Sequence, residues 1–153
     1  MLFRSVPFAV QAISGLIALF VLGVSLWLWY RAAPSAVTVP TAVEISGRRF
    51  ALEVAATEKA REQGLSSRDS LCAGCAMLFV FEYPGHYAFW MKGMRFPLDI
   101  VWLAGDTVVF VAENVSPDFS GILESGISAD RVIEFNAGMA KAEIGERVKF
   151  SSE

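Results

Sequence analysis

The feature that most constrains this chain is an uncharged segment of 23 residues, from 8 to 30, in which only Gln11, Ser14 and Ser25 are clearly polar. About 20 consecutive apolar residues are enough to cross a bilayer as a helix. Tryptophan and tyrosine residues gather at the C-terminal end of the segment, as they do at membrane–water interfaces. We therefore expect residues 1–31 to form an N-terminal membrane anchor, a single transmembrane helix.

A cleaved signal peptide is the alternative for this segment. The apolar core of a signal peptide usually has about 7–15 residues, and the core here is longer. Small residues follow it, but Pro34 spoils the cleavage pattern, so we favour an uncleaved signal anchor. Arg4 and the α-amine precede the segment and only Arg31 follows it before Glu44, which by the positive-inside rule places the following domain outside the cytoplasm. We expect a single-pass protein of the cell (inner) membrane with an extracytoplasmic, periplasmic domain.

Residues 32–41 contain two prolines and no charge, so we expect an extended linker that separates the domain from the membrane. Residues 42–153 are long enough for one domain with its own core. The chain from residue 32 onward holds all 16 acidic residues and 11 of the 13 basic ones, a formal charge of −5. Because nucleic-acid-binding surfaces are normally basic, we expect no nucleic-acid partner.

Short alternating or apolar segments, separated by glycine-containing turns, recur along the predicted domain and indicate strands. One short helix is predicted over residues 58–63, capped by Thr57 and ended by Gly64. The predicted strands are a hairpin over 42–54, the segments 77–81, 87–91, 98–103, 107–115 and 131–135, and a last strand over 147–150. We therefore predict an all-β domain, mostly β with one or two short helices, built as a jelly-roll-like sandwich or a small barrel.

The stretch 89–103 is aromatic and β-branched on both sides of Gly93 and Pro97, which predicts a central hairpin of two strands and a tight turn. Asp99 lies inside this apolar stretch. A buried carboxylate needs water or a partner, so the structural interpretation is a hydrogen-bonded carboxylate or an ion pair with Lys92, Arg95 or Arg61.

The functional interpretation of the same stretch is a pocket with convergent polar groups. We favour the structural interpretation, since structural ion pairs perturb such groups as well. The candidate pocket residues are Arg61, Trp90, Lys92, Asp99 and Glu134.

The pair Cys72 and Cys75 is the sharpest local motif and allows three interpretations. A structural disulfide suits an oxidising compartment and is the one we favour. A redox dithiol would normally open a helix, whereas this pair precedes an apolar strand. A zinc site would need two more ligands, and only His86 is evident, in a turn where we expect a solvated side chain. The sequence shows no catalytic set, and we predict no metal and no cofactor.

Several segments together resemble the domain-of-unknown-function family 192. They are REQGL at 61–65, AMLFVF at 76–81, FWMK at 89–92, PLDI at 97–100, VIEFNAG at 132–138 and GERV at 145–148. The resemblance implies a compact, mostly β domain, often exported or anchored, and it brings no activity, cofactor or catalytic residue. Two departures are Ser66, where the family tends to have methionine, and Ala76, where it tends to have glycine and where a cysteine pair precedes.

Two classes of function follow. The first is a membrane-anchored binding or assembly module whose partner is a small molecule or a protein of unknown identity. The second is a small enzyme, or a thiol-redox or metal protein, that uses the Cys72/Cys75 pair or a pocket at Asp99. We favour the first, because no catalytic set accompanies the anchor, the linker and the aromatic residues.

Overall fold

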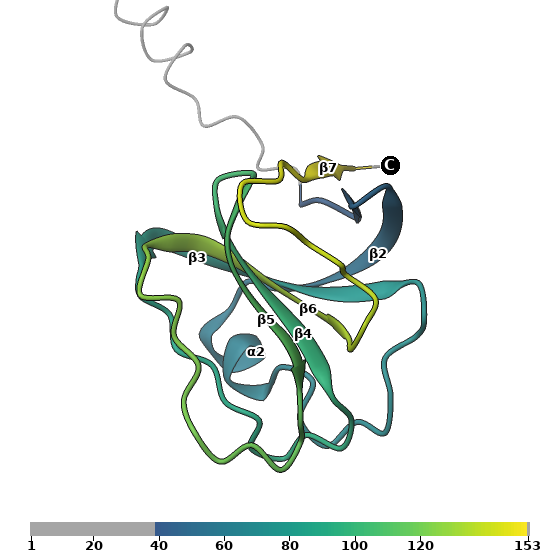
Figure 1. Cartoon of the computed structure of the whole chain (residues 1–153), viewed down its shortest axis with the longest axis vertical. Coiled ribbons are helices and arrows are strands. Elements are labelled where there is room, and N and C mark those ends of the chain that lie inside the picture. Colours follow the sequence, from purple (N-terminus) through teal and green to yellow (C-terminus); the bar gives the residue numbers. More distant parts are fainter. Residues whose placement is uncertain (1–38, 153) are drawn as a thin grey trace, which may run out of the picture. The chain divides into compact units, whose positions relative to one another are not determined.

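The computed structural model describes residues 39–152, so the predicted anchor and most of the predicted linker lie outside the described part. Among residues 39–152, no helix is long and apolar enough to cross a bilayer. The described part contains seven strands and a short helix, α2 (Figure 1). In chain order they are β1 (Ala42–Ile45), β2 (Arg48–Ala55), α2 (Glu58–Gln63), β3 (Cys75–Gly85), β4 (Leu98–Ala104), β5 (Thr107–Val115), β6 (Ala129–Asn136) and β7 (Lys149–Ser151).

The strands form one sheet in the order β5-β4-β6-β3-β2-β1-β7. Only the β2–β3 pair is parallel within this sheet, and α2 lies in the crossover between these two strands. The two edges of the sheet approach each other: the amide of Val108 donates to the carbonyl of Glu146, and the amide of Val148 donates to the carbonyl of Asp106, both at 2.9 Å. The mostly-β prediction is confirmed, as a half-barrel with little helix.

Of the two architectures predicted for this all-β domain, the jelly-roll-like sandwich was wrong. A sandwich needs two packed sheets, whereas the described strands belong to a single sheet that curls until its edges meet. The alternation of apolar residues along each strand is the same in both architectures. The pairing of distant strands decides between the two, and that pairing has no local signature in the sequence.

The sheet is apolar on both faces. In β4, Val101 and Leu103 belong to an inner core with residues from almost every strand, including the edge strands, so this core fills the concave side. Ile100 and Trp102 point the other way, into an outer core that includes Leu65 after α2. Figure 1 shows α2 on the opposite side of β4 and β6 from β7. Because both faces are covered, β4 is apolar at every position except Asp99.

The helix α2 forms where it was predicted, because its boundary signals are local. The hydroxyl of Thr57 accepts a hydrogen bond from the amide of Ala60 at 3.2 Å. At the other end, Gly64 takes a positive φ of 48° and donates its amide to the carbonyl of Ala60.

The predicted central hairpin was wrong in its first half. Residues 87–91 form no strand; Phe89 makes only an isolated bridge with Leu123. β4 pairs instead with β5 and β6, and the loop before it turns at Gly93, whose carbonyl accepts from the amide of Ser67 at 2.8 Å. Aromatic residues favour any half-buried surface, so their abundance indicated burial here rather than a strand.

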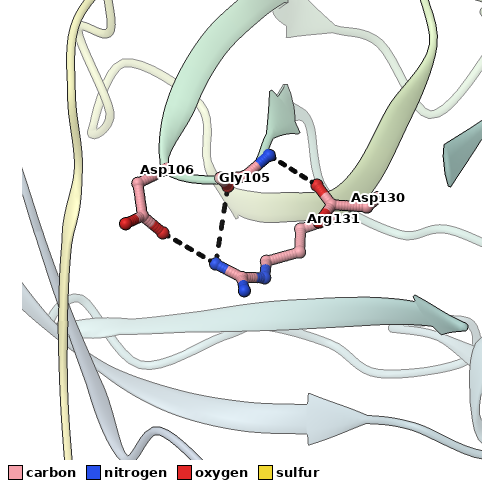
Figure 2. A network of polar contacts seen from close by, with 4 residues as sticks. All are labelled: Gly105, Asp106, Asp130 and Arg131. Carbon is pink, nitrogen blue, oxygen red and sulfur yellow. Dashed lines mark hydrogen bonds and ion pairs between the residues drawn. The ribbon is translucent and has the colours of Figure 1, made fainter. Parts of the chain in front are cut away.

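A polar network fastens the end of the half-barrel where its edges meet (Figure 2). Arg131 of β6 donates to Asp106 at 2.8 Å and to the carbonyl of Gly105 at 3.4 Å, while the amide of Gly105 donates to Asp130 at 2.7 Å. The guanidinium of Arg131 also lies 5.0 Å from the ring centroid of Phe150 in β7. The turn between β4 and β5 is thereby joined to both β6 and β7.

Candidate functional site

A cavity of about 170 Å³ lies between α2, the loop that precedes β4 and the outer face of the sheet. An engineered cavity of about 150 Å³ is large enough to bind benzene, so this one can hold a ring or a branched aliphatic group. It is lined by residues of three regions. They are residues 61–66 of α2 and its C-terminal end, Phe79, Phe81 and Glu134 of the sheet, and Tyr87, Ala88, Phe89, Trp90 and Met94 of the loop.

Glu134 enters this cavity because of its place in β6. Val132 and Glu134 face the outer core, whereas Ile133 and Phe135 face the inner core. Its cross-strand neighbours are Met77 and Ile100, both apolar. The residue is 5% exposed, and its Oε2 atom has no hydrogen-bond partner among the described residues. This burial raises the pKa of the Glu134 carboxyl to about 8, so the group carries a proton at neutral pH while the cavity is empty.

Aromatic rings form much of the cavity wall. The rings of Phe81 and Tyr87 are stacked, with centroids 3.4 Å apart, and Phe79 and Phe89 meet edge to face at 5.0 Å. Trp90 also lines the cavity but is 52% exposed, which places an indole at its mouth. A buried acid and a set of ring faces are thus presented to the same small space.

Arg61 is the cation of this site, and its position is fixed by backbone groups. Its Nη1 atom donates to the carbonyl of Ala56 at 2.7 Å and to the carbonyl of Val80 at 3.0 Å. The guanidinium lies 5.2 Å from the ring centroid of Phe81. Glu62 also lines the cavity, from the exposed side of α2.

Asp99 lies elsewhere, and the predicted ion pair with Lys92, Arg95 or Arg61 was wrong. Its carboxylate is 3% exposed and accepts three backbone hydrogen bonds, from the amides of Asn114 at 2.9 Å, Met139 at 3.1 Å and Ala140 at 3.3 Å. The partners of the buried Asp99 carboxylate are therefore backbone amides, where a cation was predicted. The alternative of a hydrogen-bonded structural carboxylate is the one that the geometry supports.

Local irregularities bring these donors to Asp99. The register of β4 and β5 shifts between Leu98 and Ile100, and Asn114 opposite takes a positive φ of 48°, as in a β-bulge. After β6, the chain turns at Gly138 with a φ of 76° and presents the next two amides.

Of the five candidate pocket residues, Arg61, Trp90 and Glu134 line one cavity. Lys92 is exposed in the neighbouring turn and borders a separate hollow together with Phe119, and Asp99 borders a third hollow with Lys141. The cluster of aromatic residues at 87–90, outside any strand, was the available signal for a site.

Cys72 and Cys75 are joined by a disulfide, in agreement with the favoured interpretation. The amide of the Asn136 side chain donates to the carbonyls of Leu71 at 2.8 Å and Cys72 at 3.3 Å, which fixes this turn against β6. The pair does not line the cavity. Within residues 39–152, no three His, Cys, Asp or Glu side chains gather closely enough to hold a metal ion.

Two solved structures are similar to this chain. One is a Sinorhizobium meliloti protein described provisionally as a transcription regulator, with 29% identity and a TM-score of 0.66 over 71% of this chain and 90% of its own. The other is a protein of unknown function from Novosphingobium aromaticivorans, with 28% identity and a TM-score of 0.66 over 76% of this chain and 91% of its own.

No protein with a curated function matches the chain. Residues 41–150 match the profile of DUF192, a family described as an uncharacterised ACR. That match covers most of the chain and carries the motifs around the cavity, so the chain belongs to the domain-of-unknown-function family 192.

Proposed function

We propose that this domain is a binding module that takes the apolar body of a small ligand into the cavity beside α2. The observation that carries the proposal is the Oε2 atom of Glu134, a buried acceptor at the wall of that cavity that has no partner within residues 39–152. Almost all buried polar atoms in proteins are hydrogen-bonded, and each exception requires an explanation. A ligand that donates to this oxygen would supply one.

Catalysis finds less support in the same geometry. Asp99 uses both carboxylate oxygens to accept backbone amides, and the Cys72–Cys75 disulfide lies outside the cavity. The cavity itself offers the carboxyl groups of Glu62 and Glu134 and one guanidinium, whose Nη1 donates to backbone carbonyls. Such a set suits recognition better than the activation of a nucleophile.

Nucleic-acid binding is raised by the description of the Sinorhizobium meliloti protein. The formal charge of −5 from residue 32 onward argues against it, because phosphate contacts require a basic surface. We therefore keep the small-molecule proposal, and we propose that residues 1–31 tether the module to the cell membrane with the domain outside the cytoplasm.

Benzyl alcohol tests the cavity, because its ring fits the volume and its hydroxyl can donate to Glu134. Isothermal titration calorimetry with the full-length protein should show saturable binding with one site. The substitution Ala88→Phe places a ring on an exposed residue at the cavity wall and should abolish the binding. The matched control is Ala73→Phe, at an exposed alanine outside the cavity, which should leave binding unchanged. Equal binding by both variants would contradict the assignment of the cavity.

The membrane proposal has its own test. A reporter that is active only in the cytoplasm, fused after Glu153, should be inactive in the full-length protein and become active when residues 1–31 are deleted. Activity in the full-length fusion would overturn the proposed orientation.

A further inference from the structure

Resting on the proposed function, we infer that the ligand is an organic ammonium ion with an apolar body, whose charged nitrogen contacts Glu134. An organic ammonium ion would match three features of the cavity at once. These features are an unpartnered carboxyl oxygen, a wall of aromatic rings, and an excess of acidic over basic groups.

The first feature is a buried carboxyl oxygen that requires a hydrogen-bond donor. The Oε2 atom of Glu134 is buried between Met77 and Ile100 and has no donor among the described residues. An ammonium N–H supplies a charge-assisted hydrogen bond, which is about twice as strong as a neutral one. A carboxylate or phosphate ligand would be repelled by the ionised form of Glu134 and could accept a hydrogen bond only from its protonated form. We therefore expect anions to bind less tightly than ammonium ions.

The second feature suits a cation in particular. Ring faces attract cations within about 6 Å of their centroids, and the attraction grows when water is excluded. Phe81 is already stacked on Tyr87, and the rings left to a ligand cation are those of Tyr87, Phe89 and the half-exposed Trp90, which line the cavity. Arg61 already uses the ring of Phe81 in this way, at 5.2 Å.

The third feature is the local charge. The charged and titratable groups that line the cavity are Arg61 and Glu62 of α2, Tyr87 of the loop and Glu134 of β6. When Glu134 is ionised, the cavity is lined by two carboxylates and one guanidinium. The Nη1 atom of that guanidinium already donates to the carbonyls of Ala56 and Val80.

The burial that isolates Glu134 also couples binding to protons. The empty site holds a proton below pH 8, and an ammonium ligand requires the ionised form, so binding releases that proton to solvent. With the pKa of Glu134 at about 8, the ionised fraction rises from about 1% at pH 6 to about half at pH 8. The affinity for an ammonium ligand should therefore rise about 50-fold across this interval.

Three probes of one shape test the inference: benzylammonium, benzyl alcohol and benzoate, titrated calorimetrically into the full-length protein at pH 6 and pH 8. Benzylammonium should bind at least about tenfold more tightly than benzyl alcohol at pH 8, and benzoate most weakly. Only benzylammonium should gain affinity with pH. Heats measured in buffers of different ionisation enthalpy should show the release of nearly one proton per benzylammonium at pH 6.

The matched variant is Glu134→Gln, which keeps the shape and removes the charge. Its preference for benzylammonium over benzyl alcohol should fall to within about threefold, with no pH dependence between pH 6 and 8. Should this variant not fold, the pH series on the unaltered protein still decides the question.

Tight binding of benzyl alcohol, equal to that of benzylammonium at both pH values, would overturn the ammonium inference and leave the binding cavity standing. Failure of all three probes to bind would overturn both the inference and the proposed cavity function. Binding of benzylammonium that Glu134→Gln leaves unchanged would overturn the role of the carboxyl group.

Discussion

Two buried acidic side chains, Asp99 and Glu134, lie in adjacent cross-strand pairs of the same sheet but differ in the hydrogen-bond donors around them. Asp99 of β4 pairs with Phe135 of β6, and the next pair joins Ile100 to Glu134. Asp99 is 3% exposed and accepts three amide hydrogen bonds, whereas Glu134 is 5% exposed and its Oε2 accepts none from the described residues. Exposure alone therefore cannot tell a structural acid from one that belongs to a site.

The donors account for this difference. A buried carboxylate that accepts several amides is stabilised as an anion and fixes the loops that supply those amides. A buried carboxyl without donors costs stability in either protonation state and contributes nothing to the fold in return. The first kind is expected wherever loops must be held, and the second is expected where a ligand completes the site.

The largest expected effect comes from removing the structural acid. Asp99→Ala should lower the free energy of unfolding by about 3 kcal/mol, because three backbone amides, one buried and two partly buried, lose an acceptor and each bond to a charged group is worth about 1.5–3 kcal/mol. Urea unfolding followed by circular dichroism measures the loss. Asp118→Ala, at an exposed position, is the control and should change stability by less than about 0.5 kcal/mol. Equal urea midpoints for Asp99→Ala and Asp118→Ala would show that Asp99 stabilises the fold no more than an exposed acid does, and would contradict its role as a structural acid.

Removal of the Glu134 carboxyl group should change the free energy of unfolding in the opposite direction. Glu134→Leu should raise the free energy of unfolding at pH 7 by about 2 kcal/mol, because the apolar side chain needs neither a proton nor a donor. The same urea assay measures the gain. A loss of stability in this variant would mean that Glu134 is a structural acid as well.

The pH dependence of stability isolates the titration of Glu134. Its folded pKa of about 8 lies above its ordinary value of 4.5, so between these values the folded state keeps a proton that the unfolded state has lost. The contribution of Glu134 to stability is then greatest below pH 4.5 and falls by about 1.4 kcal/mol per pH unit as the pH rises towards 8.

Subtracting the pH profile of Glu134→Gln removes the contributions of the other acids. The difference between the two profiles should slope downward only between about pH 4.5 and pH 8. A flat difference would show that the carboxyl is solvated or paired in solution.

The smallest expected effect concerns the loop that serves Asp99. Gly138 has a φ of 76° and open space around its α-carbon, so Gly138→Ala adds no steric clash but backbone strain of about 1 kcal/mol. We expect this strain also to displace the amides of Met139 and Ala140. Gly126→Ala, with a φ of 65° and similar space, is the matched control. Gly138→Ala should cost more than the control in the unaltered protein and the same as the control when Asp99 is already alanine.

Local signals predicted much of this fold. Thr57 and Gly64 define α2 to the residue, and β5 was predicted with its observed limits, because caps, turns and strand patterns act over a few residues. The closure of the sheet through Val108 and Glu146 joins segments with no such signal. The same limit explains the error at Asp99, whose amide donors come from the backbone of β5 and of the loop after β6 and leave no trace in side-chain composition.

The candidate site was partly visible in the sequence. Glu134 stood out as a charge within an apolar strand, and Trp90 as an aromatic residue next to a turn. Their meeting with Arg61 depends on the α2 crossover, which brings residues 61–66 over the outer face of the sheet. Asp99 was placed in the same group because it is a charged residue inside the apolar stretch 89–103.

The pairing of β1 with β7 has a mechanical consequence. Ala42, at the start of β1, pairs with Ser151, at the end of β7, and the amide of Thr41 donates to the carbonyl of Ser151 at 2.9 Å. A force that pulled the two ends of the domain apart would load these hydrogen bonds one after another, as a zipper opens. Strands that are pulled lengthwise past each other share such a load among many bonds. This domain should therefore yield at low tension from its ends, and β7 should detach first while the cavity beside α2 is still intact.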